Sequence, residues 1–318
     1  MNRFKNILVV CNPESSHDAP IARALELARR NNARATVLAV TRETPGLLRY
    51  LLESAESRAA LQAELVERDR QRVESHRDFL LANGIEADAR VAIGVEFLEI
   101  IRTVIRDGHD LVMVHVDGGA GLRARLVTST TMHLMRKCPC PVWVVKPVRR
   151  KKYARILAAV DVTEGLDGDL RQSLNDRILG LASDFARMDG SELHVVQAWS
   201  VYGEGYMEVR GNIDAHALER LRQQTRQLYL DRLTELLQPY DPQGETINRH
   251  LSRGEPAEII IQLAHRLRVD LLIMGTVCRT GVAGFLIGNT AEKVLSEIKC
   301  SVLTLKPEGF QSPVTLDQ

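Results

Sequence analysis

A glycine-rich loop that leads into a helix start is the segment of this sequence best suited to bind an anion. The loop covers residues 274–290 and contains Gly275, Gly281, Gly284 and Gly288. Glycine lets the backbone approach a phosphate closely, and the N–H groups and dipole of a helix start favour negative charge. Asn289 and Thr290 open the predicted helix. Asn289 with Glu292 also predicts an N-cap and capping box, a role that can coexist with phosphate binding.

One carboxylate is placed to work with this loop. Asp161 follows the apolar residues 158–160, which end a predicted strand. A carboxylate there can accept hydrogen bonds from a ribose or from an adenine amino group. The alternative is a turn carboxylate that caps the segment after the strand. Both roles stay open on the sequence.

The usual signatures of a catalytic or metal site are missing. The sequence holds no G-x4-G-K-[ST] loop, no G-x-S-x-G elbow and no H-E-x-x-H helix. Its nine histidines lack metal-ligand spacing, and we expect His115 and His194 to be packed or hydrogen-bonded within strands. The acidic residues after the strand are spaced too irregularly for a calcium loop: Asp161, Glu164, Asp167 and Asp169. We therefore predict no catalytic residue, no metal ligand and no enzyme.

The elements that position these residues occur twice, at a constant offset of 160 residues. Residues 110–114 align with 270–274, and 140–147 align with 300–307. A repeat of half the chain indicates a duplicated domain rather than a solenoid. The predicted organisation is a first domain at 1–148, a second domain at 149–310 and a tail at 311–318, with the charged run 148–152 as linker.

Short aliphatic runs alternate with helical patterns in each half, as is typical of parallel sheets covered by helices on both faces. The predicted fold class is α/β, with two tandem doubly wound, Rossmann-like domains of five parallel strands each. The longest predicted helices are 47–83 and 213–237. The predicted strands are 6–11, 35–41, 86–93, 111–116 and 142–146, then 155–160, 192–199, 246–251, 271–275 and 302–306.

Composition excludes several classes of protein. Of 318 residues, 45% are hydrophobic and 26% are charged, which fits a globular chain rather than a disordered one. Forty-two Lys and Arg balance forty-one Asp and Glu, so no global charge attracts nucleic acid or an anionic membrane. No apolar run or leader pattern indicates a membrane helix or secretion, and the expected compartment is the cytoplasm. The five cysteines are expected to be free, mostly buried thiols.

Together these features resemble the universal stress protein family in its tandem two-domain form. The resemblance covers nearly the whole chain and rests on these segments: Asp161, Leu193-His194-Val195, Gly254-Glu255-Pro256, the 274–290 loop and the closing Val-Leu-Thr-Leu-Lys-Pro strand. It implies a fold like that of the adenine nucleotide alpha hydrolases. It also implies that Asp161 and Val195 meet an adenosine, that Met274 and Gly275 lie along its sugar and phosphates, and that the helix start at Asn289 and Thr290 holds the terminal phosphates.

Nucleotide-binding members of the family carry glycine, two residues, glycine, nine residues, glycine and then serine or threonine. Here that pattern falls on Gly275, Cys278, Gly288 and Asn289, so two of its four residues have changed. Cys278 adds a side chain where glycine would let a phosphate approach, and Asn289 replaces a hydroxyl with an amide. We expect a weakened site for ATP with Mg²⁺ in the second domain.

The first half departs further from the family pattern. Asn12 replaces the aspartate, His115 replaces the first loop glycine, and residues 128–131 read Thr-Ser-Thr-Thr. A Ser/Thr-rich helix start can still hold a small anion, but we expect no nucleoside triphosphate there. The likeness of this half to the second is expected to serve packing and partner contact.

The resemblance implies a cytoplasmic, non-enzymatic stress-response protein that supports resistance to DNA-damaging or oxidative stress, with adenine nucleotide as a regulatory ligand. The first alternative is a partner-binding scaffold with vestigial nucleotide sites or an apolar ligand. The second is a weak ATPase, for which the sequence offers neither a base nor metal ligands. The resemblance also implies that the apolar edge strands 142–146 and 302–306 pair with each other in an intramolecular pseudo-dimer, with a homodimer left open. Protein partners are expected, but the sequence does not identify them.

Overall fold

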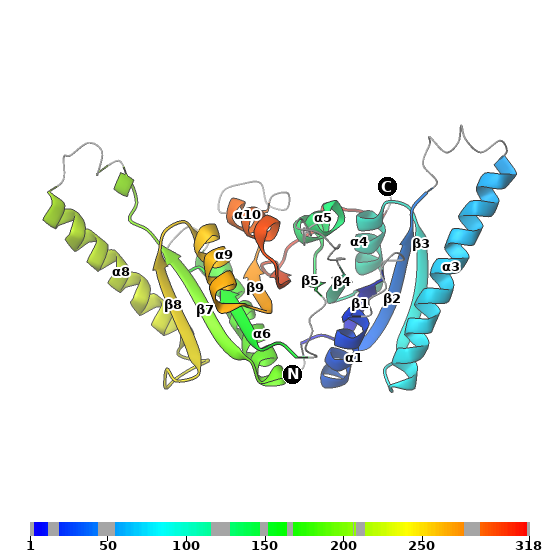
Figure 1. The fold of residues 1–318 in the computed structure, drawn as a ribbon, viewed down its shortest axis with the longest axis horizontal. Coiled ribbons are helices and arrows are strands. Elements are labelled where there is room, and N and C mark those ends of the chain that lie inside the picture. The colour runs from blue at the N-terminus through cyan, green and yellow to red at the C-terminus, as the bar shows by residue number, and fades with distance from the viewer. Residues whose placement is uncertain are drawn as a thin grey trace. The chain divides into compact units, whose positions relative to one another are not determined.

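The protein forms two compact units, each containing one copy of the sequence repeat (Figure 1). The computed structural model describes residues 3–11, 19–43, 55–115, 128–146, 152–163, 168–205, 207, 214–276 and 287–316. Residues 3–146 and 310–316 belong to the first unit, and residues 152–276 and 287–309 belong to the second.

Five described strands form the parallel sheet of the first unit, in the order β3-β2-β1-β4-β5. The elements of this unit are β1 (Asn6–Val10), α1 (Ala19–Asn31), β2 (Arg34–Thr41), α3 (Ala55–Ala82), β3 (Ala87–Ile93), α4 (Glu96–Asp107), β4 (Leu111–His115), α5 (Ser129–Lys137) and β5 (Val142–Val145).

The second unit repeats this plan, with its described strands in the order β8-β7-β6-β9-β10, again all parallel. Its elements are β6 (Arg155–Ala159), α6 (Gly168–Asp189), β7 (Glu192–Trp199), α8 (Ala215–Leu237), β8 (Ile247–Arg253), α9 (Pro256–Leu267), β9 (Leu271–Gly275), α10 (Asn289–Glu297) and β10 (Ser301–Leu305).

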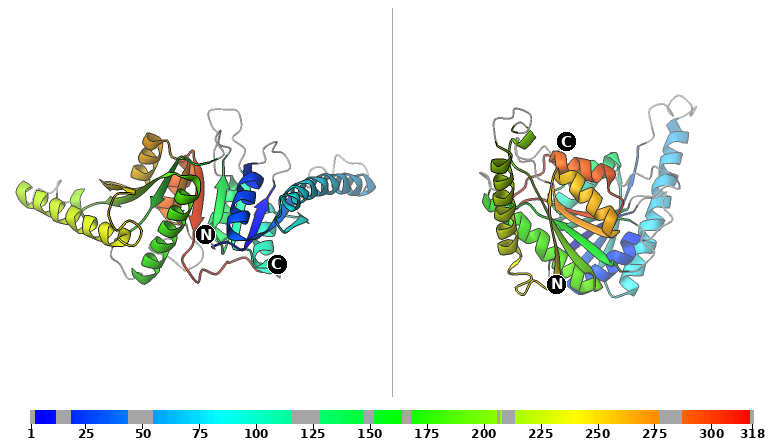
Figure 2. Two further views of the ribbon diagram at one scale, coloured as in Figure 1. Left: turned by 90° about the horizontal axis from the view of Figure 1, so that it is seen from below. Right: turned by 60° about the vertical axis from the view of Figure 1, so that its left-hand side comes forward.

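The predicted fold class is confirmed. Each predicted strand is present, with ends that differ by at most two residues from the predicted ones. Helices cover both faces of the sheet within each unit (Figures 1 and 2). The long helices α3 and α8 match the predicted 47–83 and 213–237, although residues 47–54 and 208–213 lie outside the described ones. Among the helices that the structure describes, none has the length and apolar character needed to span a bilayer.

The aliphatic composition of the central strands explains why they lie at the core. Every residue of β1 and of β4 is buried, as expected for strands covered on both faces. One carboxylate anchors the start of the first strand in each unit. Asp110 accepts hydrogen bonds from the N–H groups of residues 5 and 6, and its repeat equivalent Asp270 accepts them from residues 154 and 155. The duplication therefore extends to single hydrogen bonds.

Candidate functional site

Asp161 lies two residues after the end of β6, the strand at which the order of the second sheet reverses. Strand β6 pairs with β7 on one side and with β9 on the other, and ligands of doubly wound sheets bind at the carboxyl end of such a switch point. Asn175 of α6 fixes the backbone there. The Asp161 N–H donates to Asn175 Oδ1 at 3.1 Å, and Asn175 Nδ2 donates to the Asp161 carbonyl at 2.9 Å. Because Asn175 is buried, this pair of bonds holds the strand end in place.

The Asp161 carboxylate forms a turn with Thr163 and directs its second oxygen toward Arg171. Oδ1 accepts hydrogen bonds from the Thr163 N–H at 3.0 Å and from the Thr163 hydroxyl at 2.5 Å, as in an Asx turn. Oδ2 lies 3.9 Å from Arg171 Nε, and Arg171 also donates to the Thr163 carbonyl. The turn-capping role is therefore present. The side chain nevertheless stays 29% exposed, so a ligand can reach it.

A hollow of about 260 Å³ opens beside Asp161. It lies between the segment 161–163, helix α6 and the carboxyl-terminal part of α8. Most of its lining is polar or charged: Asp161, Val162, Thr163, Gly168, Arg171, Gln172, Asn175, Asp176, Arg232, Glu235, Leu236 and Pro239. Such a lining suits a polar ligand, and the volume is slightly below the ~300 Å³ at which pockets for small molecules usually begin.

The other residues assigned to adenosine and phosphate do not line this hollow. Val195 lies in β7 beside Ala158 and is fully buried. Met274 lies in β9 and is 3% exposed. Gly275 ends β9, and Cys278 lies outside the described residues, as do Gly281 and Gly284. The structure therefore brings Asp161 to the hollow without Val195, Met274 or Gly275.

Gly275 has a packing role that the sequence did not predict. A Cβ built on Gly275 would lie 2.6 Å from Leu174 Cδ2 of α6, closer than real side chains approach. A side chain at this position of β9 would require the buried Leu174 to shift, and glycine avoids that shift. This contact explains the glycine without any phosphate.

The start of α10 differs from the predicted cap. Gly288 is the N-cap, with φ of −63° and ψ of 145°, and the Glu292 N–H donates to its carbonyl at 2.9 Å. Asn289 is the first helical residue and makes no N-cap hydrogen bond, so the predicted capping by Asn289 is wrong. The extended backbone at Gly288 starts the helix one residue earlier than expected. Asn289 is exposed and Thr290 is half-buried.

Three residues that fix the Asp161 loop were not predicted from the sequence: Arg171, Asn175 and Gln197. Gln197 lies in β7, is 2% exposed, and accepts a hydrogen bond from the Val162 N–H at 2.9 Å. Its amide stands among the apolar residues Val195, Val196, Ala198 and Trp199, and that interruption is the signal from which it could have been found. Buried amides of this kind need hydrogen-bond partners, and here the partner is the loop backbone.

In the first unit, the corresponding positions are occupied differently. His115 ends β4 where the second unit has Gly275, and it is 9% exposed. The predicted Ser/Thr-rich helix start is confirmed at α5, where the Thr128 hydroxyl accepts a hydrogen bond from the Thr131 N–H at 3.2 Å. The helix therefore caps itself with a side chain that could otherwise contact an anion. Asn12 lies outside the described residues.

The cysteines behave as predicted wherever the structure describes them. Cys11, Cys138 and Cys140 are buried, Cys300 is half-buried, and none of these four forms a disulfide. The Sγ atoms of Cys138 and Cys140 lie 3.6 Å apart. Within the described part of the chain, no group of three His, Cys, Asp or Glu side chains is arranged to hold a metal ion.

Comparison with known proteins identifies the family of this repeat. The sequence profile described as "Universal stress protein family" matches residues 3–146 and again 152–306. Universal stress protein E of Escherichia coli K12 is 28% identical over 321 aligned residues, which cover 100% of this chain and 98% of that protein. The universal stress protein E homolog of Haemophilus influenzae is also 28% identical, and the alignment covers 96% of this chain and 98% of that protein.

Two solved structures share this fold along almost the whole chain. A putative universal stress protein from Pseudomonas aeruginosa UCBPP-PA14 has a TM-score of 0.71 and 25% identity, covering 96% of this chain and 95% of that one. A protein of unknown function from Pseudomonas aeruginosa PAO1 has a TM-score of 0.70 and 26% identity, with 96% and 94% covered. The chain therefore belongs to the universal stress protein family, with two tandem domains, and is similar along its whole length to universal stress protein E.

Proposed function

We propose that this protein acts in the stress response by binding rather than by catalysis, and that its second domain binds an adenine nucleotide as a regulatory ligand. The role extends to resistance to DNA-damaging or oxidative stress in the cytoplasm. Asp161 is the residue that recognises the nucleoside.

The observation that carries this proposal is the placement of the Asp161 carboxylate. It stands at the switch point beside β6, on a loop that Asn175 and Gln197 hold rigid, and at the edge of a polar hollow. A fixed, partly exposed carboxylate can accept hydrogen bonds from a sugar hydroxyl or an adenine amino group without loss of loop entropy. The exposed Asn289 at the start of α10 offers an amide to a phosphate.

Calorimetric titration of ATP, ADP and AMP with Mg²⁺ tests the proposal. We expect saturable binding near one site per chain, lost in Asp161→Ala. Asp169→Ala is the matched control, because Asp169 is an exposed carboxylate in the first turn of α6 that does not line the hollow. Binding that survives Asp161→Ala would place the nucleotide elsewhere.

A second candidate is a partner-binding scaffold with a vestigial nucleotide site, and the contact between Leu174 and Gly275 favours it. Because packing against Leu174 also favours glycine at this position, its presence in the loop pattern does not by itself indicate a ligand. Restoring the family residues with Cys278→Gly and Asn289→Ser separates the two functions. Affinity that appears only in this double variant would make the natural protein a scaffold.

The weak ATPase is the third candidate. ATP hydrolysis above background that disappears in Asp161→Ala would establish it in place of a purely regulatory ligand.

A further inference from the structure

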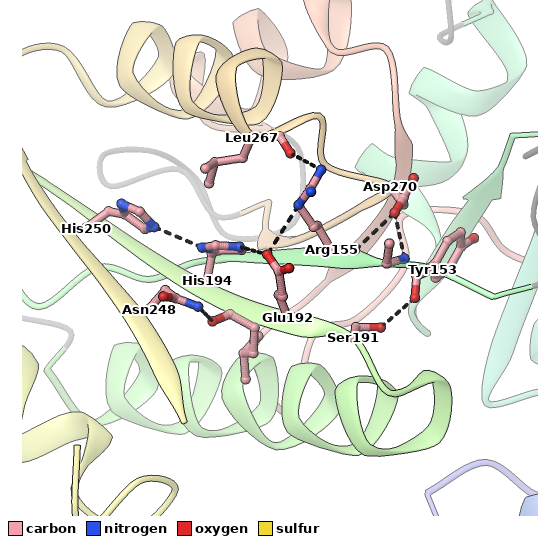
Figure 3. A network of polar contacts seen from close by, with 11 residues as sticks. Tyr153, Arg155, Ser191, Glu192, His194, Asn248, His250, Leu267 and Asp270 are labelled. Carbon is pink, nitrogen blue, oxygen red and sulfur yellow. Dashed lines mark hydrogen bonds and ion pairs between the residues drawn. The ribbon is translucent and has the colours of Figure 1, made fainter. Parts of the chain in front are cut away.

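Two histidines meet on neighbouring strands of the second domain, away from the hollow beside Asp161. The parallel register pairs His194 of β7 with Asn248 of β8, and Val196 with His250. His194 and His250 therefore project from the same face of the sheet. His194 Nδ1 lies 3.1 Å from His250 Nε2, within hydrogen-bond distance (Figure 3).

The pair lies in a charged and largely closed setting. The His194 side chain is 7% exposed, and His250 is half-buried. Glu192 Oε2 of β7 lies 3.5 Å from His194 Nε2, and Arg155 of β6 donates to the same carboxylate oxygen at 3.2 Å. Helix α9 covers this face of the sheet (Figure 3). Arg266 of α9 contributes a positive charge that acts on His250.

The distance between the two rings restricts their protonation. A hydrogen bond between them needs one facing nitrogen to carry a proton and the other to lack one, so the contact forms when both rings are neutral or when only one ring is positively charged. A second proton would set two N–H groups and two positive charges against each other at 3.1 Å. The doubly protonated pair must therefore separate.

Separation of the two histidine rings would affect β8, a strand at the edge of the sheet. Among the described strands, β8 pairs only with β7, so the contacts on β7 and the covering helices hold it in place. We propose that His194 and His250 form an acid-sensitive clasp, which holds the edge strand β8 on β7 near neutral pH and releases it when both rings are protonated. The clasp would let the second domain respond to acidification independently of any nucleotide.

The electrostatics around the clasp favour release in acid. Burial lowers the pKa of His194, against the opposing effect of Glu192, and burial lowers the pKa of His250 together with the charges of His194 and Arg266. Both pKa values then lie below the ordinary value of about 6.5 found in an unfolded chain. The clasp therefore stabilises the domain above pH 6.5, and this stability is lost as the pH falls through the lowered values.

Hydrogen exchange measured by mass spectrometry at pH 8 and pH 5, corrected for intrinsic rates, tests the clasp. In the wild type we expect the amides of β8 to lose more protection on acidification than those of β6, because only β8 is held by the histidine pair as an edge strand. His250→Gln keeps an acceptor for His194 but cannot gain a charge, so the selective loss should disappear. His265→Gln, at an exposed position of α9, is the matched control and should behave as wild type.

Three results would overturn the clasp. The first is equal loss of protection in β6 and β8 of the wild type. The second is the same selective loss in His250→Gln, or in His194→Gln if the first variant does not fold. The third is a pH profile that changes when EDTA is added, which would show that the facing nitrogens hold a metal ion rather than a shared proton.

Discussion

Leu174 Cδ2 lies 2.6 Å from the point that a Cβ on Gly275 would occupy, so any larger residue at the end of strand β9 would force the Leu174 side chain of helix α6 to shift. Leu174 is itself buried, and the contact joins the helix after the first strand of the domain to the strand that enters the glycine-rich loop. Packing against Leu174 thus favours one glycine of the loop pattern without any ligand.

The Gly275→Ala variant should lose stability. The added methyl must displace Leu174 or shift the backbone, and such overpacking costs about 1–3 kcal/mol. Urea denaturation measures this loss. Combining it with Leu174→Ala should cost less than the sum of the two single changes, because the clash is gone. Gly205→Ala is the control, since nothing lies within 4 Å of its added Cβ. Equal effects of the two glycine substitutions would contradict the packing role.

The ends of α4 and α9 offer a matched test within the repeat. Gly108 ends α4 with φ of 65°, and its equivalent Arg268 ends α9 with φ of 51°, where a side chain is strained. We expect Arg268→Gly to raise stability by about 1 kcal/mol and Gly108→Ala to lower it by about as much. No atom lies within 4 Å of a Cβ on Gly108, so the cost there comes from the backbone alone. Thermal unfolding that shifts in the same direction for both variants would refute this explanation.

Asp241 should link stability to pH in strong acid. Its buried carboxylate accepts hydrogen bonds from the N–H groups of residues 245–247 and from the Thr246 hydroxyl. Burial alone would raise its pKa, but these bonds, led by those of Thr246, lower the pKa from 3.8 to about 2. The bonds therefore stabilise the fold above pH 3.8, and the contribution is lost as the pH falls toward 2.

We expect Asp241→Asn to lower the free energy of unfolding at pH 7 by about 1–3 kcal/mol, since buried N–H groups lose a charged acceptor. The variant should also unfold with a weaker pH dependence below pH 4. Asp169→Asn removes an exposed carboxylate and should change neither quantity. A variant as stable as wild type at pH 7 would show that the loop does not depend on this carboxylate.

Much of the fold was predictable because it depends on local and repeated patterns. The 160-residue offset, the aliphatic strands and the helical spacing between them predict two parallel α/β domains, and β1 and β9 have the buried residues that such strands require. Asp161 was predictable at the switch point for the same reason, because it directly follows the aliphatic run 156–160 of the sequence.

The remainder of the site depends on contacts between distant segments. Asn175 and Gln197 reach the Asp161 loop from α6 and β7, and no sequence period encodes such contacts. Gly275 looks like a ligand glycine until Leu174 is seen against it. Asn289 looks like a cap, but the extended backbone of Gly288 takes that position.

The most direct test of nucleotide binding is an NMR titration of the ¹⁵N-labelled full chain with ATP and Mg²⁺. The nucleotide site at Asp161 predicts saturable shifts of the amides of residues 161–163, 175 and 288–290, absent in Asp161→Ala and retained in Asp169→Ala. Amide signals of these residues that stay unchanged up to millimolar nucleotide, or shifts confined to the first domain, would contradict it.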